Sequence, residues 1–394
     1  MTIFVTCYQP VPMNYQRLGD HIREVNIRNR ELRVTKLVGL TIDKAFIPSV
    51  ANVIGTDLSN YKVICREQFA CSLMQVSRDG KMPVAMFEED EAIMSPAYPM
   101  FEVIDKTVLM PQYLMMWFSR SEFDREASYY AVGGVRGSLT WEDFCNMRLP
   151  IPSITRQREI VAEYETLTNR IRLNNQTIQH LEATAQALYR KTFVDNIDKE
   201  NLPEGWRMGT IGEYSKVNSG YAFPSNWWRS NGIPVIKIGD ITNNTIDEKG
   251  CDCVDENKFE YAKKNVANKG DIVIAMTGAT LGKIAIVPKN RLLVNQRVGL
   301  FDLGEIPIER APFLYWLLQQ DEIQKEIVTV GGDSAQANVS NADIERIEIS
   351  LATKDSIKSF NSNAGILLKQ IMIKNEEISK LTELQSLLLA KMGQ

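Results

Sequence analysis

The stretch Ile171-Arg-Leu-Asn-Asn-Gln-Thr-Ile-Gln-His-Leu181 recurs 200 positions later as Ile371-Met-Ile-Lys-Asn-Glu-Glu-Ile-Ser-Lys-Leu381. The same offset relates further pairs outside this stretch: Leu188 and Leu388, Lys191 and Lys391, Leu114 and Leu314, Phe101 and Phe301, and Asp143 and Asp343. Val132-Gly-Gly recurs as Val330-Gly-Gly, two residues out of step. A repeat this long predicts duplicated domains and excludes the units of about 20–50 residues that build solenoids.

Apolar residues around both copies follow a heptad pattern, with spacings that alternate between four and three. In the first copy the pattern is Ile160, Tyr164, Leu167, Ile171, Ile178, Leu181, Ala185 and Leu188. In the second copy it is Phe360, Ala364, Leu367, Ile371, Ile378, Leu381, Leu388 and Met392. Each pattern predicts a helix on the order of 50–60 Å long. Thr155 and Asp355 are the candidate N-caps.

Two such apolar stripes can bury each other, so we predict that the helices pair as an antiparallel coiled coil. The residues predicted to mediate this pairing are Ile171, Asn174, Ile178, Leu181, Ile371, Lys374, Ile378 and Leu381. Asn174 and Lys374 interrupt the two seams near their middles and would come close at the crossing, where a polar residue specifies register. The alternative is that each helix packs only on its own domain.

The remaining sequence predicts an α+β protein with two globular domains of mixed structure, residues 1–153 and 198–352, separated by helices at 154–197 and 353–394. Expected strands cover residues 61–65, 92–94, 233–238, 271–276 and 283–287. Pro111–Phe118 is expected to start a buried helix. The length of 394 residues suits about two to three domains, each large enough for its own core.

Composition narrows the class of protein. Lys and Arg number 45 against 49 Asp and Glu, which gives a net charge of −4 and argues against a polybasic protein. Six cysteines without a CxxC pair, and only two histidines, support no metal site. We expect no membrane span, because no run of about 18 apolar residues occurs. We also expect no signal peptide, because the N-terminal residues MTIFVTCYQP have no basic segment and too short an apolar run. The expected location is the cytoplasm.

Any nucleic-acid contact must therefore come from local basic patches. Residues 272–301 contain Lys283, Lys289, Arg291 and Arg297 but no Asp or Glu, which predicts a phosphate-contacting strip. In the first half, residues 23–36 are also rich in cations, and our candidates there are Arg28, Arg30 and Lys36. A solvated basic face without a ligand is the alternative for the strip.

Three loops add candidate DNA contacts. Trp227, Trp228 and Arg229 place aromatics beside a cation, although the tryptophans could instead fill a core. Gln336 and Asn338 lie in the loop Gly331-Gly-Asp-Ser-Ala-Gln-Ala-Asn338, and their amides have the geometry that recognises adenine. Arg136 lies in the corresponding loop of the first half and suits guanine or phosphate. An ordinary connecting loop is the alternative for residues 331–338.

Signatures of catalysis are weak. Thr277-Gly-Ala-Thr-Leu-Gly-Lys283 resembles a phosphate-binding loop, but it has three residues between the glycines and Ile284 after the lysine, so we predict a tight turn between strands. No glycine-rich loop for a methyl-donor cofactor is evident. The run Glu88-Glu-Asp-Glu91 predicts a solvated acidic loop, with metal chelation as the alternative. We therefore predict no catalytic residue and no cofactor in this chain.

The second half contains a series of motifs at residues 205–213 (GWRMGTIGE), 220–223 (GYAF), 233–241 (IPVIKIGDI), 268–274 (NKGDIVI), 332–340 (GDSAQANVS) and in the segment from Ile347 into the last helix. The first half contains two more, Tyr15-Gln-Arg-Leu-Gly-Asp20 and Leu149-Pro-Ile-Pro152. Through these motifs the chain resembles the specificity subunit of type I restriction-modification systems.

This resemblance implies a DNA-recognition subunit without catalytic activity. Each domain would recognise one half of an asymmetric, bipartite site in double-stranded DNA, and the helix pair would fix the gap. Two methylation subunits and the restriction subunits would assemble on it, and S-adenosylmethionine, ATP and Mg would bind those partners. The alternatives are a coiled-coil scaffold that binds proteins and not DNA, and an enzyme that cleaves or methylates DNA alone.

Overall fold

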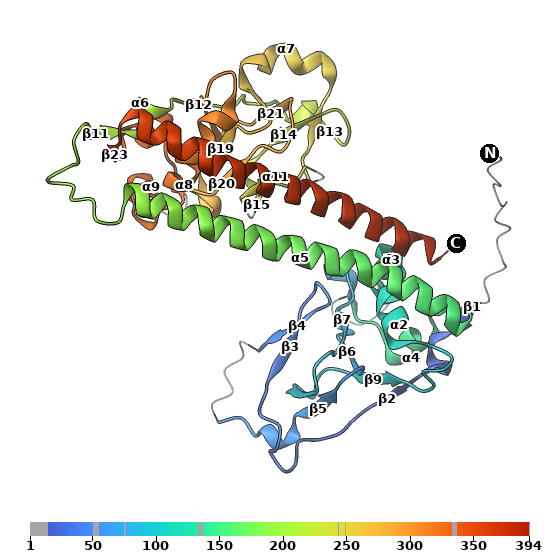
Figure 1. Ribbon diagram of the computed structural model, residues 1–394. Helices are drawn as coiled ribbons and strands as arrows, with labels where there is room; N and C mark the ends of the chain where they lie inside the picture. Colours follow the sequence, from blue (N-terminus) through green and yellow to red (C-terminus); the bar gives the residue numbers. More distant parts are fainter. Residues whose placement is uncertain are drawn as a thin grey trace, which may run out of the picture. The chain divides into compact units, whose positions relative to one another are not determined.

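The computed structural model describes residues 15–49, 55–74, 76–132, 137–242, 244–248, 250–332 and 337–393. Of the predicted DNA contacts, Arg136 and Gln336 lie outside the described residues. The chain forms two compact units, Met1–Ile171 with Lys380–Gln394, and Arg172–Ser379. Two long helices, α5 (Ile154–Phe193) and α11 (Lys354–Lys391), contribute residues to both units (Figure 1).

Unit 1 is built on a four-stranded antiparallel sheet in the order β2-β9-β6-β7. Its strands are β2 (Ile22–Glu24), β9 (Met100–Val103), β6 (Phe69–Cys71) and β7 (Val84–Met86). Three antiparallel pairs complete the unit: β1 (Tyr15–Arg17) with β10 (Arg148–Pro150), β3 (Val38–Leu40) with β4 (Phe46–Pro48), and β5 (Lys62–Cys65) with β8 (Glu91–Met94). The short helix α1 (Val76–Asp79) lies between β6 and β7 in the chain.

Unit 2 repeats this sheet as β12-β22-β19-β20. Its strands are β12 (Val217–Ser219), β22 (Val298–Phe301), β19 (Ile272–Ala275) and β20 (Ile284–Ile286). A second sheet has the order β13-β17-β14-β21-β18, with strands Trp228–Arg229, Cys253–Val254, Ile233–Ile236, Leu292–Val294 and Val266–Ala267. The remaining pairs are β11 (Arg207–Thr210) with β23 (Glu348–Leu351), and β15 (Ile241–Thr242) with β16 (Thr245–Ile246).

Three helices on each sheet follow the offset of 200 found in the sequence. In unit 1 they are α2 (Pro111–Phe118), α3 (Ser121–Ala131) and α4 (Trp141–Asn146). In unit 2 they are α8 (Ala311–Leu318), α9 (Asp321–Gly331) and α10 (Asn341–Arg346). The short helices α6 (Ile211–Tyr214) and α7 (Phe259–Ala262) complete unit 2. The duplicated α+β architecture predicted from the sequence is thus confirmed, and Pro111–Phe118 is a buried helix as expected.

A buried amide on each long helix holds the start of the neighbouring short helix. In unit 1 the side chain of Gln157 is fully buried, and its Oε1 accepts a hydrogen bond from the backbone N–H of Met110 at 2.9 Å. In unit 2 the Oδ1 of Asn361 accepts the N–H of Phe313 at 2.8 Å. The first N–H groups of a helix have no partner within it, so these amides supply the missing acceptors at the buried starts of α2 and α8.

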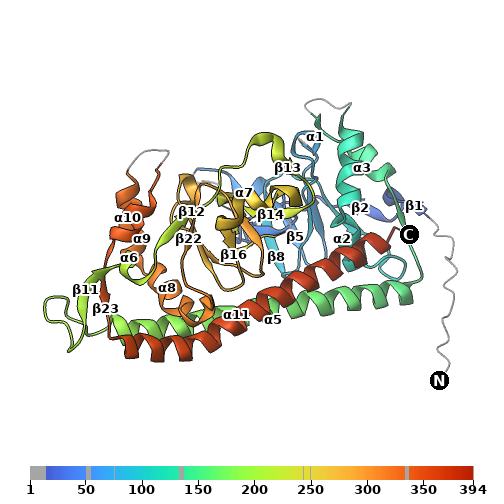
Figure 2. The same ribbon diagram turned by 90° about the horizontal axis from the view of Figure 1, so that it is seen from above.

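The long helices pair in antiparallel fashion within each unit, as the sequence predicted (Figure 2). In unit 2 the ring of Phe360 near the start of α11 packs against Tyr189 and Phe193 at the end of α5, with ring centroids 5.6 and 5.1 Å apart. In unit 1 the end of α11 meets the start of α5, where Gln385 donates to Thr168 Oγ1 at 2.7 Å and Met392 joins the core that contains Ile160.

The helices also pack on the globular domains, and α5 does so in both units, since its Ile160 lies in the core of unit 1. The alternative that each helix packs only on its own domain is therefore wrong. Ile178 and Leu181 of α5 and Ile371 of α11 belong to the core of unit 2 together with α8. Asn174 is buried, and its Nδ2 has no hydrogen-bond partner. Lys374 forms an ion pair with Glu377 at 2.9 Å. The closeness of Asn174 and Lys374 stays a prediction.

Both N-cap assignments were wrong by two residues. The Oγ of Ser153 accepts the N–H of Arg156 at 3.4 Å, and Oγ1 of Thr353 accepts the N–H of Ser356 at 3.1 Å. A hydroxyl just before the first helical residue reaches the third N–H, whereas Thr155 and Asp355 already lie inside the first turn. The corrected caps still obey the offset of 200. The strand expected at 233–238 also ends early, at Ile236, because the carboxylate of Asp240 caps a turn at the Lys237 N–H (2.8 Å).

Candidate nucleic-acid interface

The basic strip of unit 2 is divided by the register of its sheet. Lys283 and Arg297 flank the end of β19, since the N–H of Ala275 donates to Lys283 O at 2.8 Å and that of Met276 donates to Arg297 O at 3.0 Å. Lys289 and Arg291 follow β20 and lie beside the start of β19, where the N–H of Gly270 donates to Val287 O. The four residues of β19, at about 3.3 Å each, separate these ends by about 13 Å. The strip is therefore two pairs of cations and not one patch.

The two pairs differ in whether their positive charges are already neutralised by carboxylates of the protein. Lys289 forms an ion pair with Glu248, and Arg291 donates to Glu256 Oε1 at 3.1 Å while its guanidinium lies 4.8 Å from the Phe259 ring centre. Within the described part of the chain, Lys283 has no ion pair, and Arg297 donates only to the Asn338 amide oxygen at 3.3 Å. The positive charge open to a phosphate thus lies at the Lys283–Arg297 end.

Polar side chains gather around this end, which we call the polar edge: Ser219, Gln296, Arg297, Asn338, Asn341 and the turn Thr277–Lys283. Thr277 and Asn338 form an isolated β-bridge, and the N–H of Gly278 donates to Ala337 O at 3.0 Å. Ser219 Oγ donates to Asn341 Oδ1 at 2.9 Å. Amides, hydroxyls and a guanidinium are the groups that recognise base edges and phosphates. Gln336 precedes Ala337 but lies outside the described residues.

The turn Thr277–Lys283 does not form a phosphate cradle. Its N–H groups at Gly278, Leu281, Gly282 and Lys283 all donate to backbone carbonyls of the protein. Gly278 and Gly282 have φ of 70° and 81°, values that favour glycine in a tight turn. The turn between strands expected from the sequence is what the structure contains.

The tryptophan loop packs on a small apolar cluster. Trp227 and Trp228 are half-buried against the cluster that contains Phe223 and Val254. A lysine ammonium group lies over each indole: Lys258 Nζ is 4.9 Å from the Trp227 ring centre, and Lys237 Nζ is 4.2 Å from that of Trp228. Arg229 forms an ion pair with Asp255 at 3.4 Å. The tryptophans are therefore partly core residues, and only part of their surface faces outward.

The sequence prediction missed the neighbours of this loop. Tyr221 stacks on Trp227 with ring centroids 6.0 Å apart, and Tyr261, which is 62% exposed, packs on the same indole at 5.2 Å. The group adjoins the polar edge, because the N–H of Gln296 donates to Tyr221 O and Asn265 donates to Ser219 O at 2.7 Å. The signal was available in the lysines and aromatics interleaved between residues 258 and 264.

Most cations of the first half are already matched. Lys36 pairs with Glu89, Arg33 with Glu91 at 3.5 Å, and Arg28 donates to Asn60 O at 2.6 Å. Among the described residues Arg30 is exposed and has no ion pair. The acidic run Glu88–Glu91 therefore neutralises the basic segment that precedes it in sequence. Arg136, the other candidate in this half, is not described.

Metal ligation and thiol chemistry find little support in the part of the chain that the structure describes. No group of three or more His, Cys, Asp or Glu residues there could hold a metal ion. Burial raises the pKa of the Cys71 and Cys251 thiols, which disfavours the reactive thiolate. Burial also raises the pKa of Asp271 to about 6, but this carboxylate accepts the N–H of Asn268 at 2.7 Å and stabilises a turn. No helix among the described residues has the length and apolarity needed to cross a bilayer.

Comparisons with known proteins agree with the geometry. The family model "Type I restriction modification DNA specificity domain" matches residues 203–379. The MjaIX type I restriction enzyme specificity subunit of Methanocaldococcus jannaschii is 22% identical over 307 residues, covering 74% of this chain and 70% of that one. The MjaVIII specificity subunit of the same organism is 23% identical over 248 residues, covering 59% of this chain and 58% of its relative.

A solved structure shares the fold over the whole chain. The S subunit of a type I restriction-modification system from M. genitalium aligns with a TM-score of 0.60 and 14% identity, covering 100% of this chain and 99% of that one. Its likeness supports the arrangement of two sheet-bearing domains and paired long helices. The family model over residues 203–379 and the curated relatives show that the chain is similar to type I restriction-modification specificity subunits.

Proposed function

We propose that this chain is the DNA sequence-recognition subunit of a type I restriction-modification complex. One domain recognises each half of an asymmetric, bipartite site, and the chain also holds the methylation and restriction subunits. The observation that carries the proposal is the duplicated sheet, β2-β9-β6-β7 and β12-β22-β19-β20, with different side chains at the two copies. Two copies of one fold with unlike surfaces are suited to two unlike half-sites.

The polar edge is the part of unit 2 that we assign to DNA. Lys283 and Arg297 contact phosphates, which position the domain without specifying sequence. Asn338, and Gln336 two residues before it in sequence, contact base edges in the major groove, where amides pair with adenine. Trp227, Trp228 and Arg229 border the same surface. Lys289 and Arg291 contribute less to DNA binding, because their charges are already matched by Glu248 and Glu256.

The paired helices set the spacing between the two half-sites in this proposal. Each helix contributes to both units, so a change in helix length alters the separation of the domains. Adding one heptad to both α5 and α11 is expected to lengthen the gap in the target while both half-sites stay the same. A change in the half-sites themselves would contradict this role of the helices.

Catalysis belongs to the partners in this account. S-adenosylmethionine, ATP and Mg bind the methylation and restriction subunits, and this chain supplies no catalytic residue. The test is incubation of the pure chain with DNA, Mg and S-adenosylmethionine, which is expected to give binding without cleavage or methyl transfer. Cleavage or methylation by the pure chain would favour an enzyme that acts alone. A chain that binds partner proteins but no DNA would favour the coiled-coil scaffold.

A further inference from the structure

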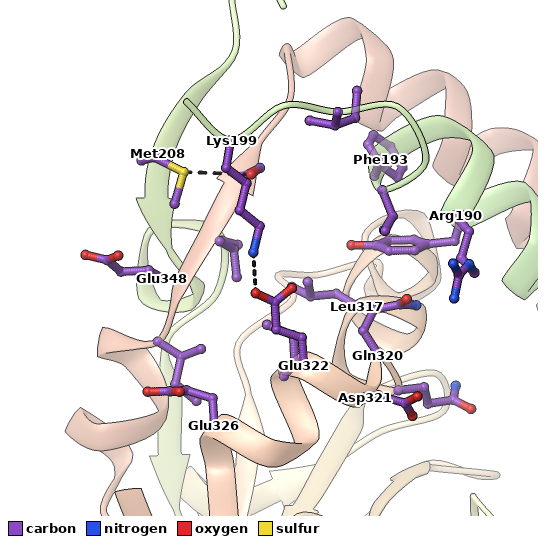
Figure 3. A pocket seen from close by; sticks show the side chains of 18 of the residues that line it. Arg190, Phe193, Lys199, Met208, Leu317, Gln320, Asp321, Glu322, Glu326 and Glu348 are labelled. Carbon is purple, nitrogen blue, oxygen red and sulfur yellow. Dashed lines mark hydrogen bonds and ion pairs between the residues drawn. The ribbon is translucent and has the colours of Figure 1, made fainter. Parts of the chain in front are cut away.

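Unit 2 contains a cavity of about 760 Å³ at the end of α5, under the chain that leads to β11 (Figure 3). Its floor is apolar and buried, formed by Tyr189, Phe193, Leu317, Ile323 and Ile347. Part of its rim is apolar but exposed, since Met208 and Val330 keep 42% and 40% of their surface. Apolar surface left open above a buried floor is typical of a site that receives another molecule.

The rest of the rim is predominantly acidic. Asp321, Glu322, Glu326 and Glu348 line it. Figure 3 shows Lys199 reaching from the connecting segment to Glu322, with which it forms an ion pair. Arg190 at the other side is paired with Asp195 at 3.3 Å. The lining also contains Asp343 and Arg346, whose charges offset each other. Among the described residues Asp321, Glu326 and Glu348 form no ion pair, so the cavity keeps an excess of negative charge and favours a cationic occupant.

The equivalent place in unit 1 is closed by the chain itself. Trp117 and Arg120 stand where unit 2 has Leu317 and Gln320, and they are only 5% and 7% exposed. The Arg120 guanidinium lies 4.0 Å from the Trp117 ring centre and 3.7 Å from a carboxylate oxygen of Glu122, the counterpart of Glu322. Tyr15 packs edge-on against Trp117 at 6.2 Å, where unit 2 has Met208.

The C-terminal end of the chain seals this place. Tyr15 Oη donates to Gly393 O at 3.0 Å, and a Cβ on Gly393 would come within 2.3 Å of Arg120 Nη2. The same fold therefore surrounds an aromatic ring with a stacked guanidinium in one unit. In the other unit it surrounds a cavity with an apolar floor and an acidic rim.

We propose that the cavity of unit 2 is a docking site for a protein partner, which inserts an aromatic side chain with an adjacent arginine. The partner's aromatic ring and guanidinium take the positions in unit 2 that the side chains of Trp117 and Arg120 occupy in unit 1. The ring covers Leu317 and Phe193, and the guanidinium meets Glu326 and the other rim carboxylates. Aromatic and arginine side chains are the residues that dominate interface energetics, and guanidinium pairs with carboxylate in a fixed geometry.

The partner is a methylation subunit, so this inference rests on the proposed function. Because unit 1 is closed at the equivalent place, the chain offers the site once and not twice. Two identical methylation subunits would then bind with unequal affinity, the tighter one using the cavity. This asymmetry distinguishes the inference from the general expectation that the chain is a scaffold.

The test uses the double variant Leu317→Trp with Gln320→Arg. It places in unit 2 the two residue types that close the equivalent site of unit 1, so that the chain fills its own cavity. The probe is the purified methylation subunit encoded with this chain, and each binding step is followed by calorimetry and native mass spectrometry. The tighter step is expected to weaken at least 10-fold, while the affinity of the chain alone for DNA stays the same. The midpoint of thermal unfolding reports whether the variant folds.

A second variant keeps the test independent of core packing. Glu326→Lys with Glu348→Lys reverses charge on the exposed rim and is expected to weaken the same step several-fold, most strongly at low salt. Glu305→Lys, an exposed change away from the cavity, is the matched control. Wild-type binding by both cavity variants would overturn the docking site but not the proposed function. A wild-type chain that binds no methylation subunit would overturn both.

Discussion

The short helices of the two units correspond more closely than their strands do. The three helices α2, α3 and α4 and their counterparts α8, α9 and α10 begin at positions related by the offset of 200. The segments between the first and third strands of each main sheet, residues 25–68 and 220–271, differ in strand number and pairing. The helices are tied to α5 and α11 through Gln157 and Asn361, whereas those segments pack on small cores of their own. The constant part of the fold is the part that holds the long helices.

Deleting one half tests this comparison most severely. A fragment of residues 1–197 keeps one domain and one seam, so we expect it to dimerise through its helix. The dimer would present the same surface twice and recognise a symmetric two-part site. Methylation mapping of DNA modified by the fragment with its methylation subunit checks the outcome. An asymmetric site for the fragment would contradict the assignment of one domain to each half-site.

The polar edge can be tested against the other half of the basic strip. Replacing Lys283 and Arg297 by alanine is expected to lower DNA affinity at least 10-fold and to reduce the slope of log affinity against log salt by about 2. Replacing Lys289 and Arg291, which are already paired with Glu248 and Glu256, is expected to cost less than about threefold. Fluorescence anisotropy over a salt series measures both, and equal losses would refute the division of the strip.

The buried amides test the shared helical framework. Asn361→Ala leaves the N–H of Phe313 without its acceptor, and Gln157→Ala does the same to Met110. Each is expected to lower the free energy of unfolding by about 2 kcal/mol. Urea denaturation gives the value, with Ser362→Ala as an exposed control on α11. Neutral effects in both units would show that these contacts do not hold the short helices.

The seam of the coiled coil offers a stabilising change. Asn174 is buried with its Nδ2 unpaired, so Asn174→Leu is expected to raise the free energy of unfolding by about 1–2 kcal/mol. Thermal denaturation measures the change, and crosslinking along α5 and α11 checks whether the register is kept. Destabilisation by this substitution would mean that the amide has a partner we have not assigned.

A pH dependence is expected from the start of β19. Burial raises the pKa of Asp271 to about 6 in the folded chain, above its ordinary value of 3.8, so the folded state holds the proton more tightly. Stability from this group is therefore fully present below pH 3.8 and is lost as the pH rises through 6. Asp271→Asn is expected to stabilise the chain by on the order of 1 kcal/mol at pH 7 and by nothing near pH 4. A pH-independent effect would contradict this.

The apolar periodicity and the repeat predicted the long helices and the duplicated domains, because both patterns can be seen directly in the sequence. The heptad stripes fixed the two helices, and the offset of 200 predicted the duplication that the sheets repeat. The candidate interface could be predicted only in part, since residues 272–301 contain four cations whose separation depends on strand register. Glu248 and Glu256, which neutralise two of them, come from outside that window. The filled site at Trp117 in unit 1 and the cavity at Leu317 in unit 2 depend on side-chain packing, which residue spacing does not predict.

The measurement that tests the central claim most directly is a methylome, determined by single-molecule sequencing for the native strain and for a deletion of this gene. In the deletion strain, methylation is expected to disappear at one gapped, asymmetric two-part motif and at no other. Retention of every such motif in the deletion strain would contradict the assignment of this chain as the DNA-recognition subunit.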